Sequence, residues 1–333
     1  MAQLSMFLGL SPKAIGQIGA GKHAPNGQLD VAMIQSLVRV GHVDDLVTTY
    51  GYVIVDECHH IPAVSFERVL SEVKARFLTG LTATPRRRDG LHPITEMQLG
   101  PVRFAVDARS QAARRPFHLR LIVRETAFGT GRTVSIDRIQ ALYAALATDD
   151  QRNRLILDDV TAALGEGRSP ILLTERKDHL ESLAARLRGV AHHLVALHGG
   201  MTSTERRAAA TALASIPDNE SRLVIATGRY IGEGFDDARL DTMFLAMPTS
   251  WKGTLIQYTG RLHRLRPGKT EVRIYDYVDR EVPMLIRMFE RRLRGYRAIG
   301  YSRDVTPGER EESNDELVGD DNEDAHAPSD APE

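Results

Sequence analysis

Short apolar runs alternate with longer amphipathic stretches along most of the chain. A strand buried on both faces is a short continuous apolar run, whereas a surface helix repeats its apolar positions with a period of 3.6 residues. After residue 150 the runs are 171–174, 193–197, 223–226, 242–246 and 272–278. The helical stretches are 151–165, 177–188, 203–214, 254–263 and 281–295. This alternation predicts a doubly wound α/β domain with a parallel sheet.

The first hundred residues repeat the pattern on a smaller scale. Apolar runs at 29–34, 52–55 and 77–81, with a helical stretch at 63–75, predict a small parallel sheet. Between the two α/β regions, residues 106–136 carry six arginines and show no clear period. The predicted division is therefore a partial first lobe at 1–105, an interdomain connection at 106–150, a second lobe at 151–302 and a tail at 303–333.

The composition is that of a globular protein with material for two domains. The chain has 333 residues, of which 42% are hydrophobic and 26% charged. No apolar stretch approaches the roughly 20 residues that cross a bilayer. The single cysteine, Cys58, excludes internal disulfides and agrees with a reducing compartment. We therefore expect a cytoplasmic protein.

A net charge of -1 conceals a strong asymmetry between the body of the chain and its end. Residues 304–333 hold 12 of the 44 acidic residues and one basic residue, so the rest has 42 basic against 32 acidic residues. A basic body suits nucleic-acid phosphates, although a solvated surface explains the same charge. The acidic tail is too polar to fold alone, so we expect it to be disordered.

The most informative segment is residues 51–60, an apolar run that ends in Asp56, Glu57, a cysteine and two histidines. Functional residues of open α/β sheets gather beyond the carboxyl ends of the strands. Hydrolysis of a nucleoside triphosphate needs a carboxylate for Mg²⁺ and a group that orients or deprotonates the attacking water. Asp56 and Glu57 can divide these two tasks.

Two other chemistries compete for this segment. A zinc site is disfavoured because five consecutive residues cannot easily converge on one tetrahedral ion. A nucleophilic Cys58 paired with histidine is possible, but a buried packing cysteine is the more common case. Neither alternative has support elsewhere in the sequence.

The hydrolase interpretation does have support elsewhere. Thr82 and Thr84 follow the next predicted strand, where hydroxyl groups could link a phosphate site to a neighbouring lobe. Gln257, Arg261 and Arg264 occupy a predicted helix, with the two arginines three residues apart on one face. Guanidinium groups so placed can reach charge on a transferring phosphoryl group. A solvated basic helix face would explain the arginines equally well if they stood alone.

With residues 227–236 added, the set resembles superfamily 2 helicases of the DEAD/DEAH-box (DECH-type) class in order and spacing. The resemblance covers about residues 4–300 and is closest to the repair-helicase and type III restriction-subunit branch. Residues 56–59 resemble motif II, 82–84 motif III, 172–177 motif IV, 227–236 motif V and 257–264 motif VI.

The resemblance implies two RecA-like doubly wound parallel-sheet lobes and ATP hydrolysis, with Mg²⁺, coupled to movement on DNA. It implies Asp56 for Mg²⁺, Glu57 as catalytic base, Thr82 and Thr84 for coupling, Gly234 and Asp236 near the nucleotide, Thr227 near the nucleic-acid backbone, and Gln257, Arg261 and Arg264 in catalysis. Arg264 would be the arginine finger, and RNA is a less favoured substrate than DNA.

The phosphate-binding loop of such enzymes is missing from this sequence. Residues 16–23 match Gly-x-x-x-x-Gly-Lys, but His23 stands where a Mg²⁺-binding hydroxyl is needed. Pro25 and Gly27 would also break the helix that must follow. A glycine-rich turn is therefore predicted here. We expect an incomplete, N-terminally truncated first lobe with exposed apolar surface, and a chain that is inactive or needs a separate chain carrying the loop. The alternative is a non-catalytic module, derived from a helicase, that binds nucleic acid or regulates a partner.

Overall fold

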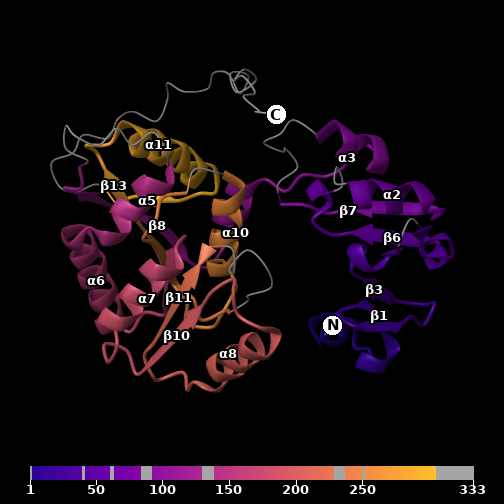
Figure 1. The fold of residues 1–333 in the computed structure, drawn as a ribbon, viewed down its shortest axis with the longest axis horizontal. Coiled ribbons are helices and arrows are strands. Elements are labelled where there is room, and N and C mark those ends of the chain that lie inside the picture. The colour runs from indigo at the N-terminus through magenta and orange to yellow at the C-terminus, as the bar shows by residue number, and fades with distance from the viewer. Residues whose placement is uncertain are drawn as a thin grey trace. The chain divides into compact units, whose positions relative to one another are not determined.

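The computed structural model describes residues 2–39, 42–60, 64–83, 92–129, 139–228, 237–249 and 252–304 (Figure 1). The chain divides into two compact units. The first comprises Met1–Gln111 with Trp251–Gln257, and the second comprises Ala112–Ser250 with Tyr258–Glu333. Of the predicted disordered tail at 303–333, residues 305–333 lie outside the described residues, whereas Arg303 belongs to a strand and Asp304 forms an ion pair with Arg120.

The second unit is built on a seven-stranded sheet in which every described pairing is parallel. Its order is β10-β11-β9-β12-β13-β8-β14. The strands are β8 (His118–Thr126), β9 (Pro170–Thr174), β10 (His193–Leu197), β11 (Arg222–Thr227), β12 (Thr242–Leu245), β13 (Glu271–Asp279) and β14 (Ser302–Arg303). Its helices are α5 (Ile139–Thr148), α6 (Asp150–Gly165), α7 (Lys177–Arg186), α8 (Ser203–Ser215) and α11 (Pro283–Ala298). Helices α4 (Ala108–Ala113) and α10 (Lys252–Leu262) each contain residues assigned to both units.

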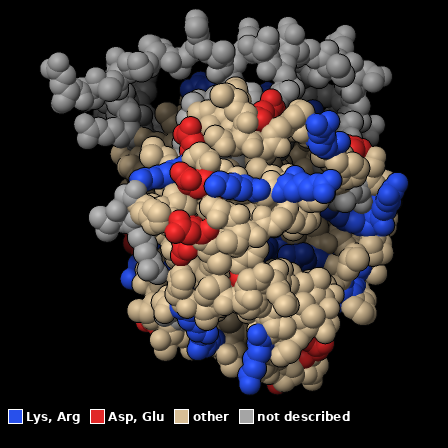
Figure 2. All heavy atoms as spheres, turned by 90° about the vertical axis from the view of Figure 1, so that its right-hand side faces the viewer, with Lys and Arg blue, Asp and Glu red and all other residues tan. Residues whose placement is uncertain are grey.

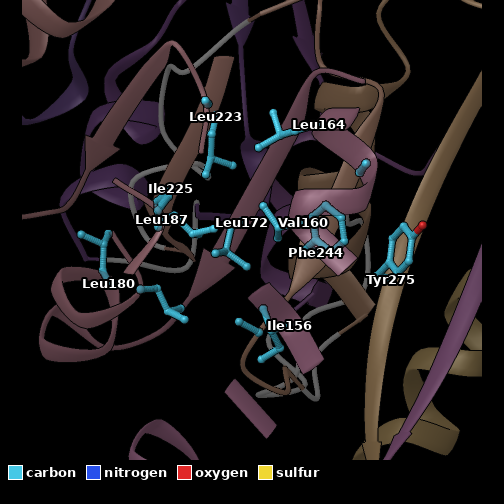
Figure 3. Packing of buried hydrophobic residues seen from close by; sticks show 14 of the residues in the cluster. Ile156, Val160, Leu164, Leu172, Leu180, Leu187, Leu223, Ile225, Phe244 and Tyr275 are labelled. Carbon is cyan, nitrogen blue, oxygen red and sulfur yellow. The ribbon is translucent and has the colours of Figure 1, made fainter. Parts of the chain in front are cut away.

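Both faces of this sheet are covered, as the doubly wound prediction requires. Leu172, Phe244 and Tyr275 pack against α6 and α7 (Figure 3). Successive strand residues point to opposite faces, and Leu173 and Met243 are also buried, at 2% and 0% exposure. The large parallel sheet therefore has a continuous apolar core on each side.

Strand β8 falls inside the range where the sequence predicted an interdomain connection, 106–150. It pairs with β13 along nine residues, and α5 also belongs to the second unit. The sequence does not reveal this strand, because Arg120 and Arg124 interrupt its apolar run. In the fold their charges are neutralised by ion pairs, Arg120 with Glu271 and Asp304, and Arg124 with Asp159.

The described part of the first unit contains three small sheets. β1 (Gly16–Gly19), β2 (Lys22–Ala24) and β3 (Asp30–Ala32) form one, β4 (Val38–Arg39) and β5 (His42–Val43) a second, and β6 (Tyr52–Val55) and β7 (Phe77–Gly80) a third. Its helices are α1 (Ala2–Leu8), α2 (Val64–Glu72) and α3 (His92–Leu99), with 3₁₀ turns at Pro12–Ala14, Ile34–Ser36, Asp45–Thr48 and Cys58–His60. The prediction that the run at 29–34 joins the same sheet as β6 and β7 was wrong, because β3 pairs with β1 instead.

The glycine-rich segment at residues 16–23 is a β-hairpin. β1 and β2 are antiparallel, and the turn between them has φ of 51° at Ala20 and 80° at Gly21. Two consecutive positive φ angles are the requirement of a tight type I′ turn. His23 Nε2 lies 2.9 Å from Asp44 Oδ2. The prediction of a turn rather than a phosphate loop is confirmed.

The β6–β7 sheet is covered on one face only. Val53, Val55 and Leu78 pack with Leu70 of α2. On the opposite face Tyr52, Ile54 and Phe77 are 55%, 58% and 57% exposed, although parallel strands are normally buried on both sides. Of the 18 exposed large hydrophobic residues in the described chain, only Ile139, Val190 and Leu265 belong to the second unit. The predicted exposure of apolar surface on the first lobe is confirmed.

Candidate functional site

Asp56 and Glu57 lie directly beyond the carboxyl end of β6. Two backbone hydrogen bonds fix the strand ends there, from Leu81 N to Val55 O and from Cys58 N to Leu81 O, both 2.9 Å. Glu57 has φ of 49°, a left-handed conformation that is uncommon outside glycine and often found at functional sites. The backbone therefore turns at Glu57, and Asp56 Oδ1 accepts the Glu57 N–H at 2.9 Å.

The Glu57 carboxylate is connected to Thr82 through a buried histidine. His59 Nδ1 lies 3.1 Å from Glu57 Oε2 and 3.0 Å from Thr82 Oγ1. The His59 side chain is only 7% exposed, whereas that of Glu57 is 46% exposed. Both contacts are to the same ring nitrogen, so the Glu57 carboxylate and the Thr82 hydroxyl share one hydrogen-bonding group, and a change at either can affect the other.

Cys58 is a packing residue. It is 4% exposed, and burial raises the pKa of its thiol, which disfavours the nucleophilic thiolate. A side chain at Gly80 would clash with Cys58 Sγ, since the added carbon would lie 2.9 Å from it. Among the described residues no group of three or more His, Cys, Asp or Glu side chains could hold a metal ion. The nucleophilic interpretation of Cys58 therefore loses support.

The donor set at β6 fits Mg²⁺ better than it fits a whole nucleotide. Mg²⁺ typically takes one or two carboxylates and completes its shell with water and substrate phosphates, so the exposed Asp56 carboxylate is a suitable ligand. A triphosphate also needs a cradle of backbone N–H groups at a helix start. The one segment with a matching sequence, residues 16–23, is the hairpin described above, so that cradle does not occur there.

In the second unit, three candidate segments meet at the carboxyl ends of the central strands. Thr227 ends β11 beside Thr174 of β9. Next to them, Tyr258 Oη of α10 lies 3.5 Å from Glu175 Oε1. A side chain at Gly228 would place a carbon 2.0 Å from Tyr258 Oη and 2.6 Å from Glu175 Oε1. Only glycine allows this close approach.

Helix α10 carries the remaining described candidates. Gln257 and Arg261 are one turn apart, and both are half-buried. Arg264 is not on the helix, which ends at Leu262, so the prediction that the two arginines share a helix face was wrong. The helix stops because Arg264 leads into a Pro-Gly turn. Arg264 is instead an exposed residue of the following loop.

Three predicted residues, Thr84, Gly234 and Asp236, lie outside the described residues. The structure brings Asp56, Glu57 and Thr82 together in the first unit, and Thr227 and Tyr258 of α10 together in the second. Sequence reasoning missed two residues that connect these candidates, His59 and Glu175. The only signal was their position, since each lies within a matched motif segment.

Two family models match the sequence. The first, Type III restriction enzyme, res subunit, matches residues 4–87, and the second, Helicase conserved C-terminal domain, matches residues 153–266. The chain belongs to the superfamily 2 helicases. The first match also agrees with the restriction-subunit branch that the motifs indicated.

Relatives of this superfamily 2 chain include viral and archaeal proteins. The L396 protein of Acanthamoeba polyphaga mimivirus, named as an ATP-dependent RNA helicase, is 23% identical over 75% of this chain and 47% of its own length. DNA 3'-5' translocase XPB2 of Sulfurisphaera tokodaii is 24% identical over 45% of this chain and 29% of its own length. The chain thus spans half or less of these two relatives.

A solved structure supports the fold of this superfamily 2 chain. S. cerevisiae Dbp5 bound to RNA and ADP BeF3 covers 87% of this chain and 70% of its own chain, with a TM-score of 0.54 and 12% identity. At that identity the likeness concerns the fold alone. No helix among the described residues has the length and apolar character needed to span a membrane.

Proposed function

We propose that this chain forms part of an ATP-dependent DNA helicase or translocase in which ATP hydrolysis, stimulated by nucleic acid, drives movement on DNA. The observation that carries the proposal is the arrangement of Glu57, His59 and Thr82 at the carboxyl ends of β6 and β7. It combines an accessible base carboxylate with a buried connection to a second strand.

Each described residue has a defined task in this proposal. Asp56 would hold Mg²⁺, which supplies charge neutralisation on the phosphates when bound. Glu57 accepts a proton from, or orients, the attacking water, while His59 holds the Glu57 carboxylate in place. Arg261 and Arg264 would lie at the γ-phosphate, where an arginine finger accelerates related reactions about 10³- to 10⁵-fold, and Gln257 would also take part in catalysis. Thr227 would contact the nucleic-acid backbone.

DNA is the proposed substrate rather than RNA. The support is the XPB2 relative, which is named as a DNA translocase, and the excess of basic residues outside the tail. On the face drawn in Figure 2, Lys and Arg side chains are more prominent than Asp and Glu. Such a surface attracts phosphates of either nucleic acid, so a competition between DNA and RNA of the same length is part of the test.

We further propose that a polypeptide outside this sequence completes the first unit and brings the phosphate cradle. The bare face of Tyr52, Ile54 and Phe77 supports this, because covering apolar surface is worth about 25 cal/mol per Å². A separate chain is the form we propose. A cytoplasmic location would suit both chains.

The test is ATP hydrolysis by the purified chain, with and without single-stranded DNA, alone and with added candidate partner chains. DNA-stimulated hydrolysis that falls at least 100-fold in Glu57→Gln is expected. The control is Glu67→Gln, an exposed carboxylate on α2 of the same unit. Equal hydrolysis by the two variants would refute the role of Glu57.

A second candidate function is a non-catalytic nucleic-acid-binding or regulatory module. The hairpin at residues 16–23 favours it, since the segment that resembles a phosphate loop cannot act as one. This function predicts salt-sensitive DNA binding without hydrolysis, unchanged by Glu57→Gln and Arg264→Ala.

A further inference from the structure

The ammonium group of Lys269 lies at the carboxyl end of α10. Lys269 Nζ donates hydrogen bonds to the backbone carbonyls of Leu262 at 3.1 Å, Arg264 at 2.9 Å and Leu240 at 2.7 Å. The first two acceptors are the last residue of α10 and the candidate arginine finger two residues later. The third precedes β12, so the contact joins the end of α10 to the body of the second unit.

A tight turn at residues 266–269 places Lys269 beside the carboxyl end of α10. Lys269 N donates to Arg266 O at 3.2 Å, with Pro267 and Gly268 at the two central positions. Gly268 has φ of 80°, as a type II turn requires at that position, and proline is favoured before it. The sequence from Arg264 to Lys269 therefore folds back on the helix end.

The residue between the two capped carbonyls is anchored as well. His263 Nε2 lies 2.9 Å from Tyr301 Oη, and the two rings stack with centroids 5.7 Å apart. Burial lowers the pKa of His263 to about 3, so the ring is neutral at neutral pH. Phe117 lies beside both groups, 6.3 Å from the His263 ring and 6.0 Å from Lys269 Nζ.

The chemistry of the contact suits lysine. The last carbonyls of a helix have no partner within the helix, and a cation there is also favoured by the helix dipole. An ammonium has three donors, and the site offers three carbonyl acceptors. Burial lowers the pKa of Lys269 to about 8, so the charged form prevails at neutral pH.

We propose that Lys269 is a positioning residue for Arg264: by holding the carbonyls of Leu262 and Arg264 it fixes the path of the chain on which the arginine finger stands. This proposal rests on the function proposed above, in which Arg264 reaches the γ-phosphate. Lys269 itself touches no reacting atom.

The first test needs no catalytic activity. Hydrogen exchange of the full chain is followed by mass spectrometry in peptides that cover 258–266, for the parent, Lys269→Met and the exposed-surface control Lys74→Met. In Lys269→Met these peptides should exchange about tenfold faster than in the parent, while the exchange rates of β9 and β11 stay the same. Lys269→Arg, which keeps donors in a planar fork, should be intermediate. Exchange equal to that of Lys74→Met would overturn the proposal.

The second test separates positioning from the function itself. Where the parent hydrolyses ATP, Lys269→Met should lower kcat about tenfold at unchanged KM. In a protein that already carries Arg264→Ala, adding Lys269→Met should not lower kcat further. Additive losses would overturn the proposal, because they would show an action independent of Arg264. A parent without hydrolysis, alone or with partner chains, contradicts the proposed function, and the exchange result then decides the positioning role by itself.

Discussion

We predict that the free energy of unfolding falls in acid because the imidazole of His179 is buried. His179 lies in the first turn of α7 and is 1% exposed. Its Nδ1 lies 2.9 Å from Thr174 Oγ1 and its Nε2 lies 3.0 Å from Asn153 Oδ1. Asn153 Nδ2 donates to Ala147 O, so Oδ1 is the acceptor that faces the ring. The neutral tautomer with hydrogen on Nε2 therefore satisfies both contacts.

The magnitude follows from the pKa of His179. Burial lowers it from 6.5 to about 4, with Arg152, Arg176 and Arg186 acting in the same direction and Asp178 opposing them. Between these pH values the unfolded chain binds a proton that the folded chain does not, so the free energy of unfolding falls as pH falls. A tenfold difference in proton affinity is worth about 1.4 kcal/mol, which makes the full loss about 3 kcal/mol.

The assay compares urea unfolding of the parent and His179→Gln by circular dichroism at pH 7.5, 6, 5 and 4. Glutamine can donate to Asn153 and accept from Thr174 without titrating. Between pH 7.5 and pH 4 the free energy of unfolding of the parent should fall by about 3 kcal/mol more than that of the variant, with most of the difference developing below pH 6.5. Parallel pH curves for the two proteins would refute the reasoning, because other titrating groups are common to both.

Two further predictions concern the other candidate elements. Burial raises the pKa of Glu175, so its charged form opposes folding once pH exceeds about 4.5, the usual value for Glu; Glu175→Gln should raise the melting temperature at pH 7 but not at pH 4. On the β6–β7 sheet, Val55→Thr should destabilise the first unit by about 1–3 kcal/mol, because it buries a hydroxyl in an apolar cluster. Ile54→Thr, on the exposed face, should cost clearly less, as limited proteolysis of the first unit would show.

The strands and helices of the second unit could be predicted because their signals are local. The run at 223–226 became β11 (Arg222–Thr227), and the helix predicted at 203–214 became α8 (Ser203–Ser215). Helix α8 begins at a capping box in which Thr202 and Glu205 satisfy each other's backbone N–H groups. β8 could not be predicted in this way, since its arginines are neutralised by residues up to 184 positions away.

In the candidate site, too, some features could be predicted from the sequence and others only from the fold. The order and spacing of motifs II to VI indicated the superfamily and, as candidates, the base Glu57 and the arginine finger Arg264. The left-handed turn at Glu57, the position of His59 between Glu57 and Thr82, and the end of α10 before Arg264 became visible only in the fold. Each depends on how a chain bends after an element ends, which a periodic pattern does not specify.

The sequence by itself determined the class of protein, the parallel-sheet core of the second unit and the absence of a functional phosphate loop at residues 16–23. Burial on both faces, strand length and turn residues are properties of neighbouring positions, so they can be read along the chain. Tertiary structure decided that β3 pairs with β1 and not with the β6–β7 sheet, and that one face of the β6–β7 sheet is exposed. It also decided that the Lys269 side chain caps the carboxyl end of α10. These outcomes depend on contacts between segments distant in sequence, whose geometry only the folded chain fixes.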